Sequence, residues 1–503
     1  MSPWLPVLGA GMLLLHVIVN LVSPYGFHRD EFLYLAMGRH LELFGMDFPP
    51  FIAIAAKATL GTLGGSLPAV RFLPAVVGAL LVLLAGLLAR RFGGGRYAQL
   101  TAGLAVALSP LFLRAGNLFQ PVVFDILWWT LALLLLARLA DTEAARARRT
   151  WLLLGVVLGL GLLTKFSIAF IGIGLVAGIV ATPLRQSLLT RGPWLALGVA
   201  LLIGAPSIVG QLTLGLPVLG QMRDLQAEQL DRMSPADFLA GQLEMFQPLI
   251  LLAMLGAMRL ARPPHRAVLI ACLTTFLLLM LLGGKAYYVG PIYPALFAAG
   301  AVWLEASAAR QGRIASALWR TIPLAVIVIF GAVSFPFGVP ILRPDLMARY
   351  STAIGVRSTT NVGEPLDLPH DYSDMLGWED QVAATQRIFD SLPPEDREEL
   401  VVIGTNYGRA GAHDHLGVPL GLPGSVAPIG SYWYFGPGEK PGKVALIIGG
   451  ERETLAAFFR SVVPAGRVTG QWRVPEEREV PLWIARDPVR PIQDVWESFR
   501  GEN

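Results

Sequence analysis

Long apolar runs alternate with short polar breaks through the first two-thirds of the chain. A helix needs about 20 mainly apolar residues to cross the hydrocarbon core of a membrane. Eleven segments of about that length, or a little shorter, stand out: residues 5–23, 68–90, 98–113, 118–139, 150–163, 166–183, 194–214, 246–262, 266–283, 286–306 and 320–340. The pattern therefore predicts a polytopic α-helical membrane domain over residues 1–340, with about 11 transmembrane helices.

The last third of the chain follows a different pattern. Charged residues become ordinary in frequency after Arg343, and short apolar runs of the kind found in buried strands appear. The expected elements are a helix at 378–391, strands at 401–404 and 444–449, a helix at 451–461 and a strand at 480–487. We therefore expect residues 341–503 to form a soluble α/β domain.

Composition supports the membrane assignment. Hydrophobic residues make up 54% of the 503 residues and charged residues only 15%, whereas soluble domains carry about 25% charged residues. The single cysteine, Cys272, lies inside an apolar run, which excludes disulfides and thiolate metal sites within one chain. The N-terminus has no basic segment and no small-residue cleavage site, so it is expected to remain as the first span.

Arginines gather in every second break between the apolar runs, and these breaks are short. Short basic loops are typical of the cytoplasmic side of a membrane protein. The opposite face then carries the loop 24–67, the break at Lys165, the turn before Lys285 and the C-terminal domain. The pattern thus predicts that the C-terminal domain lies on the extracytoplasmic side.

Six ionisable residues from separate stretches are expected at this outer face: Asp30, Glu31, Asp47, Asp125, Lys165 and Lys285. Ionisable groups at membrane depth are costly, so each needs a partner or a task. Lysines can hold a phosphate, a carboxylate can act as a general base toward a hydroxyl, and paired carboxylates can bind a hard cation. An outward-facing site has no nucleotide sugar, so an activated sugar would have to arrive on a lipid carrier.

Simpler roles are open for the same residues. Asp30 and Glu31 fit the N-terminal cap of a helix at 31–44, and Asp47 before two prolines fits a turn. The lysines could extend to the interface, and Tyr287 and Tyr288 fit an aromatic belt. The segment 413–415, His-Asp-His, lacks further ligands, so we expect a surface loop there rather than a metal site.

Several motifs, in order along the chain, resemble those of family 39-like glycosyltransferases. They are Asp30-Glu31, Gly45-Met46-Asp47-Phe48-Pro49-Pro50, Gln120-Pro121 with Asp125, Leu163-Thr164-Lys165, Lys285-Ala286-Tyr287-Tyr288, Asn406-Tyr407-Gly408-Arg409-Ala410-Gly411, and Tyr432-Trp433 with Gly436-Pro437. These enzymes have the GT-C fold and use polyprenyl-phosphate-linked sugars. The family is related to protein O-mannosyltransferases and to the aminoarabinose transferase that acts on lipid A.

The resemblance implies a role for each candidate residue. Asp30 matches the catalytic aspartate, the expected base, and Asp125 matches a second acidic position beside the site. Asp47 matches an acidic position that helps to bind a divalent metal cation in some relatives; no nucleotide cofactor is expected. The candidate substrate-binding residues are Glu31, Lys165, Lys285, Tyr287 and Tyr288, with the two lysines on the donor phosphate.

The combined prediction is an inverting glycosyltransferase of the bacterial inner membrane. It would move a sugar from a polyprenyl-phosphate donor to a hydroxyl of a lipid, glycan or protein acceptor, with no nucleic-acid partner. The alternative is a membrane transporter or lipid flippase with an extracytoplasmic binding domain. Transporters place ionisable groups near the bilayer midplane, whereas here these groups gather at the outer edge. A non-catalytic scaffold would leave Asp125 and the two lysines unexplained.

Overall fold

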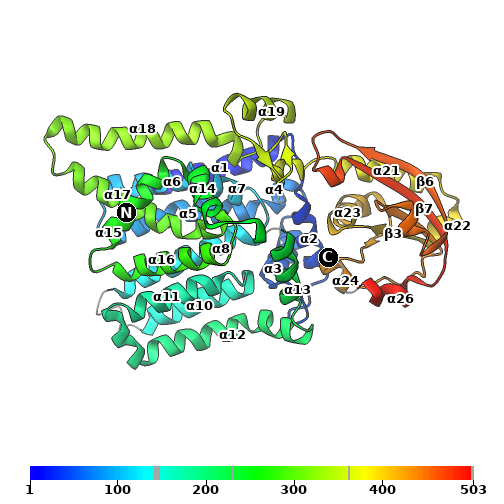
Figure 1. The fold of residues 1–503 in the computed structure, drawn as a ribbon, viewed down its shortest axis with the longest axis horizontal. Helices are drawn as coiled ribbons and strands as arrows, with labels where there is room; N and C mark the ends of the chain where they lie inside the picture. Colours follow the sequence, from blue (N-terminus) through cyan, green and yellow to red (C-terminus); the bar gives the residue numbers. More distant parts are fainter. Residues whose placement is uncertain (141–147, 229, 361–362, 500–503) are drawn as a thin grey trace.

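The computed structural model describes residues 1–140, 148–228, 230–360 and 363–499, which form a helical body beside a sheet domain (Figure 1). The helices of the body are α1 (Trp4–Val22), α2 (Arg29–Arg39), α3 (Phe51–Thr62), α4 (Leu67–Val70), α5 (Phe72–Arg91), α6 (Arg96–Ala107), α7 (Pro110–Gly116), α8 (Pro121–Leu139), α10 (Arg148–Thr164), α11 (Ile168–Val180), α12 (Arg191–Thr213), α13 (Pro217–Glu228), α14 (Pro235–Phe246), α15 (Leu249–Leu260), α16 (Arg266–Leu281), α17 (Tyr293–Ala308) and α18 (Arg313–Gly338).

Each of the eleven predicted apolar segments contains a helix. Within the described residues, six helical stretches are long and apolar enough to cross a membrane, and up to nine if each of three bent helix pairs counts as one span. The bent pairs turn by 67° between α6 and α7 and by 107° between α14 and α15. The helical membrane-type body is therefore confirmed, while the count of 11 spans stays a prediction.

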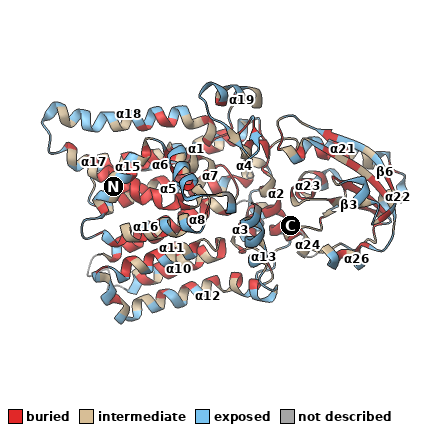
Figure 2. Cartoon of the chain, in the orientation of Figure 1, coloured by how far each residue is buried: buried red, intermediate tan, exposed pale blue. Residues whose placement is uncertain are grey.

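The outer helices of the body expose apolar side chains, as a lipid-facing surface requires. In the most apolar stretch of 18 residues, only 28% of the residues of α18 and 39% of those of α12 are buried, against 78% for α8 in the centre. Figure 2 shows the same contrast. Leu202 on α12 is 76% exposed and Ile329 on α18 is 63% exposed. Apolar patches of this extent mark a surface that contacts other apolar material.

Hydrogen bonds join several of the basic breaks between helices to one another at one end of the body. Arg259 donates to the carbonyl of Phe92 at 3.0 Å, and Arg91 donates to the carbonyl of Ala137 at 3.1 Å. The amide of Ser2 reaches the same end. In Figure 1 this end carries the N-terminus, and the sheet domain packs against the opposite end. Arg91 and Arg259, from two of the basic breaks, therefore lie together, while the side of the membrane that this end faces stays a prediction.

The sheet domain holds a five-stranded mixed sheet in the order β4-β3-β5-β7-β6. Strand β3 runs parallel to β4 and β5, and β7 runs antiparallel to β5 and β6. The elements after the body are α19 (Pro344–Ala353), β1 (Ser358–Thr359), β2 (Pro365–Leu366), α20 (His370–Ser373), α21 (Trp378–Ser391), α22 (Pro394–Glu399), β3 (Leu400–Gly404), α23 (Tyr407–Ala412), β4 (Ser425–Val426), α24 (Gly430–Tyr434), β5 (Val444–Ile448), α25 (Arg452–Leu455), β6 (Phe459–Thr469), β7 (Glu479–Pro488) and α26 (Ile492–Val495).

Three local predictions are wrong. The helix expected at 451–461 ends at Leu455, because the following residues pair with β7 as strand β6. The helix expected at 31–44 ends at Arg39. The segment 413–415 is not a surface loop: it lies in the short helix η4 (His413–Gly417), and His415 packs its ring 4.8 Å from that of Phe27.

One buried ion pair fixes the position of α2. The Glu31 carboxylate is fully buried and accepts two hydrogen bonds from the Arg71 guanidinium, at 2.9 and 2.7 Å. It also accepts from the backbone amides of His28 and Phe119, each at 2.8 Å. Glu31 therefore completes the N-terminal capping box of α2 with His28 and ties α2 to the start of α5 and to the loop before α8.

The Glu31→Gln variant is expected to lower the thermal unfolding midpoint of the detergent-solubilised protein markedly. Loss of one charge from a buried ion pair leaves the other charge unpaired, at a cost of about 3–5 kcal/mol. The matched control is Glu479→Gln, which breaks the exposed pair with Arg467 and should cost less than about 1 kcal/mol. Equal losses in the two variants would contradict the structural role of Glu31.

Candidate functional site

Asp30 is held by hydrogen bonds from two parts of the structure. The carboxylate accepts from Gln120 Nε2 at 3.1 Å on one oxygen and from the Tyr407 hydroxyl at 2.9 Å on the other. Gln120 is the N-cap residue of α8, and Tyr407 begins α23 in the sheet domain. The Asp30 side chain remains 30% exposed. Asp30 is therefore an oriented carboxylate that a second molecule can still reach.

Lys285 lies near this carboxylate, and Lys165 lies near Lys285. Lys285 interacts electrostatically with Asp30 and with Lys165. The Lys165 ammonium lies over the ring of Tyr288, 5.0 Å from its centroid, and Tyr287 meets Tyr288 edge-on at 4.7 Å. The structure thus brings together Asp30, Lys165, Lys285 and the two tyrosines, which the sequence placed in three separate stretches.

Asp125 adds a second carboxylate beside Lys165. It is buried on α8, and its Oδ2 accepts a hydrogen bond from Ser167 Oγ at 2.7 Å. It also interacts electrostatically with Lys165. Asp125 is therefore paired with the lysine at the α10–α11 break, and its role in the site stays a prediction.

The sequence analysis missed a group of charged residues that borders Asp30. Asp371 and Asp374, on and after α20, lie 3.9 and 3.7 Å from His28 Nε2. Burial would raise the pKa of Asp371, but Arg114, at 3.1 Å, and His28 outweigh this effect and lower the pKa. The signal in the sequence was weak, because these residues belong to a stretch of ordinary charge density after the last apolar run.

Glu31, although next to Asp30 in sequence, points into the protein. Its contacts are the ion pair with Arg71 and two backbone amides, and none of its surface is exposed. Substrate contact by Glu31 stays a prediction, and the observed contacts favour a role in holding α2.

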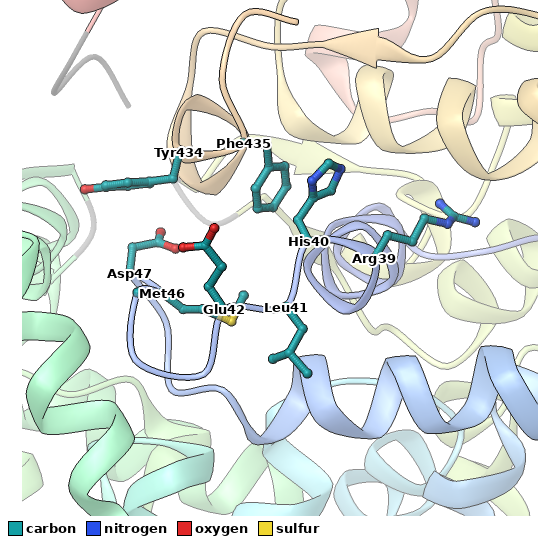
Figure 3. Close-up of a pocket in the computed structure, with 9 residues that line it drawn as sticks. Arg39, His40, Leu41, Glu42, Met46, Asp47, Tyr434 and Phe435 are labelled. Carbon is teal, nitrogen blue, oxygen red and sulfur yellow. The ribbon is translucent and has the colours of Figure 1, made fainter.

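Asp47 lies in a different place, beyond the C-terminal end of α2. It is buried and accepts hydrogen bonds from Ser431 Oγ at 2.7 Å and from Gln221 Nε2 at 3.4 Å. Figure 3 shows it in a pocket with Glu42, Arg39 and side chains of the sheet domain. Across the described ranges no group of three or more His, Cys, Asp or Glu residues is placed to hold a metal ion. The donor set around Asp47 does not fit a metal site, so no chemical step is assigned to one.

Residues 47–209 match a protein family described as dolichyl-phosphate-mannose-protein mannosyltransferase. Among solved structures, the chain is similar to ArnT from Cupriavidus metallidurans bound to undecaprenyl phosphate, at 17% identity and a TM-score of 0.60, with 95% of this chain and 97% of that chain covered. The apo state of that protein matches at 18% identity and a TM-score of 0.59, with the same coverage. No curated protein sequence matches significantly.

A more distant match is the archaeal oligosaccharyltransferase AglB from Archaeoglobus fulgidus, in complex with an inhibitory peptide and a dolichol-phosphate. It is 13% identical, with a TM-score of 0.50, and the alignment covers 82% of this chain and 63% of that chain. The family match confirms the predicted resemblance. The similarity to the ArnT structure confirms the predicted GT-C fold, which here is a helical membrane-type body with a C-terminal sheet domain.

The Asp47→Asn variant should gain stability relative to the unaltered protein as the pH rises. Burial raises the pKa of Asp47 above its usual 3.8, so the folded protein binds this proton more tightly than the unfolded chain does. The stability that protonation gives is complete below the usual pKa and is lost as the pH rises through the folded-state pKa. Asparagine does not ionise, so the unfolding midpoint of Asp47→Asn should rise relative to that of the unaltered protein between acidic and neutral pH.

Thermal unfolding of both proteins across that pH range checks the prediction. The exposed Asp345→Asn variant is the matched control. A difference that is constant with pH for Asp47→Asn, or an equal trend in the control, would contradict the effect of burial.

Proposed function

We propose that this protein is an inverting glycosyltransferase that moves a sugar from a polyprenyl-phosphate donor to an acceptor hydroxyl at the outer face of the membrane. The observation that carries the proposal is the position of Asp30, a partly exposed carboxylate held by Gln120 and Tyr407 near Lys285, which in turn lies near Lys165. The family match over residues 47–209 and the fold shared with ArnT support it.

Asp30 is the general base in this proposal. The acceptor hydroxyl gives its proton to the carboxylate as its oxygen attacks the anomeric carbon of the sugar. The attack comes from the face opposite the phosphate, so the bond between the anomeric carbon and the phosphate oxygen breaks and the configuration inverts. Gln120 and Tyr407 hold the carboxylate in one orientation, which is the condition for efficient proton transfer.

Lys165 and Lys285 meet the other electrostatic demand of the step. Negative charge builds on the polyprenyl phosphate as it leaves, and fixed cations stabilise that charge best when they are already in place. Lys165 interacts electrostatically with Asp125, and its ammonium lies over the Tyr288 ring, which limits its freedom to turn away. Tyr287 and Tyr288 offer aromatic faces and hydroxyls to the donor sugar.

The proposed orientation follows from the two ends of the body. The basic breaks lie at the end that carries the N-terminus, and the sheet domain packs at the other. The positive-inside rule places the basic end in the cytoplasm and hence the sheet domain outside it, in a bacterial inner membrane. A donor that reaches the outer face must be carried by lipid, and the similar ArnT structure is bound to undecaprenyl phosphate.

The Asp30→Asn variant is expected to lose transfer by about 10²- to 10⁴-fold, the usual contribution of a positioned general base. Asparagine keeps the size of the side chain but cannot take up the acceptor proton. The measurement is release of polyprenyl phosphate from a panel of polyprenyl-phosphate sugars supplied to purified protein. Asp345→Asn, at an exposed position of α19, is the control. Full transfer by Asp30→Asn would remove Asp30 as the base.

The Lys285→Met variant is expected to weaken donor binding and turnover together. Loss of a charge-assisted contact with a phosphate costs about 1.5–3 kcal/mol, or roughly ten- to a hundredfold in kcat/KM for the donor. Lys443→Met is the matched control, because this lysine is 65% exposed and pairs with Glu399 at the far side of the sheet domain. An unchanged kcat/KM in Lys285→Met would show that the donor phosphate binds elsewhere.

A further inference from the structure

Two adjoining pockets open where the C-terminal end of α2 meets the sheet domain. Their volumes are about 460 and 250 Å³, and they share Arg39, His40 and Phe435 as walls. Neither pocket is lined by Asp30 or by the two lysines. The helical body and the sheet domain both contribute side chains, as Figure 3 shows for the smaller pocket. Ligand sites often form at such domain interfaces.

The walls combine flat rings with hydrogen-bonding groups. The His40 imidazole stacks on the Phe435 ring, with centroids 4.4 Å apart and an angle of 10° between the planes, and Tyr434 also lines the smaller pocket. Burial lowers the pKa of His40, so the ring is neutral at physiological pH. The ionisable acidic and basic lining groups besides His40 and the tyrosines are Arg39, Glu42, Asp47 and Asp414. This combination suits the apolar face and the hydroxyl groups of a sugar ring.

The balance of charge argues against an anionic ligand. Arg39 is the one lysine or arginine among the lining residues, and it stands against three carboxyl groups. A phosphate or another anion would meet more repulsion than attraction. A neutral polyhydroxylated ligand avoids this repulsion, because hydroxyls can donate to the carboxylates and accept from the guanidinium.

The pocket walls are held in place before any ligand arrives. Asp414 accepts hydrogen bonds from Ser425 at 2.7 and 2.9 Å and from the Tyr432 hydroxyl at 2.9 Å. Arg39 Nη2 lies 3.0 Å from His415 Nδ1, and Asp47 accepts from Ser431. A site whose polar groups are already oriented loses less entropy on binding.

The pocket lies on the same helix as Asp30 but well away from it. Six to ten residues separate Asp30 from Ala36, Arg39 and His40, which corresponds to roughly 9–15 Å along a helix axis. A sugar bound in the pocket is therefore not the one whose hydroxyl reaches Asp30. The separation fits an acceptor with several sugar units.

We propose that the paired pocket at the C-terminal end of α2 binds a neutral saccharide unit of the acceptor, remote from the hydroxyl that reacts. The assignment of the bound saccharide to the acceptor rests on the proposed glycosyltransferase function; the binding of a neutral saccharide does not. The acceptor class that follows is a glycan or glycolipid with a neutral oligosaccharide portion.

The test measures binding of fluorescently labelled oligosaccharides to the purified full chain in detergent, without any donor. The probes are neutral gluco-, galacto-, manno- and N-acetylglucosamine oligomers of increasing length, and the sulfated form of each. At least one neutral series should bind with a Kd of about 1 mM or tighter, better as oligomers than as monosaccharides. Phe435→Ala and Glu42→Gln should each weaken this binding by about tenfold or more.

Phe458→Ala is the matched control, because this ring is half-buried in the same domain, lies against Phe499 and lines neither pocket. Thermal unfolding midpoints show whether each variant is folded. If Phe435→Ala does not fold, Glu42→Gln, at an exposed position, still tests saccharide binding. Binding that is absent, insensitive to both pocket variants, or stronger for the sulfated forms would overturn the proposal.

A parallel assay of polyprenyl-phosphate release separates the two hypotheses. Transfer without saccharide binding at the pocket would overturn the proposed role of the pocket and leave the proposed function standing. Saccharide binding that depends on Phe435 and Glu42, with no release from any donor, would leave the pocket standing and overturn the proposed function.

Discussion

The arrangement of the site depends on one buried ion pair, between Glu31 and Arg71. Two charges removed from water are tolerated only when the remaining hydrogen-bonding capacity is satisfied. Here the carboxylate accepts from the guanidinium and from the amides of His28 and Phe119, while Arg71 also donates to the carbonyl of Gly26. The pair thus fastens the first turn of α2 to two other segments, and it fixes the residue immediately before Glu31.

That neighbour is Asp30, and the contrast between the two acids is informative. Glu31 is enclosed and fully paired, whereas Asp30 keeps an accessible surface and takes its two hydrogen bonds from neutral groups. Successive residues of a helix point about 100° apart, so one acid can anchor the helix while the next faces the space beside Lys285. Such a rigid anchor would hold the proposed base within the narrow range of geometry that catalysis requires.

The sequence predicted the parts of this structure that depend on local pattern. Apolar runs located a helix in each of eleven segments, and the helix at 378–391 and three strands were found within a residue or so of their ends. Strand β6 was missed because its stability comes from pairing with β7 rather than from its own residues. The hydrogen bond from Tyr407 to Asp30 joins residues 377 positions apart, and no local pattern reports such a contact. Asp371 and the pocket at α2 were missed for the same reason.

Tyr407 gives the sheet domain a direct part in holding Asp30, and this has a consequence for how the chain could be altered. The two domains are not interchangeable modules. A foreign sheet domain grafted onto this helical body would have to supply a hydroxyl at the place of Tyr407, and also a partner for Asp47 at the place of Ser431. Under the proposed function, domain exchange would thus disturb the proposed base, so a new acceptor preference is better sought by small changes to the loops around α24.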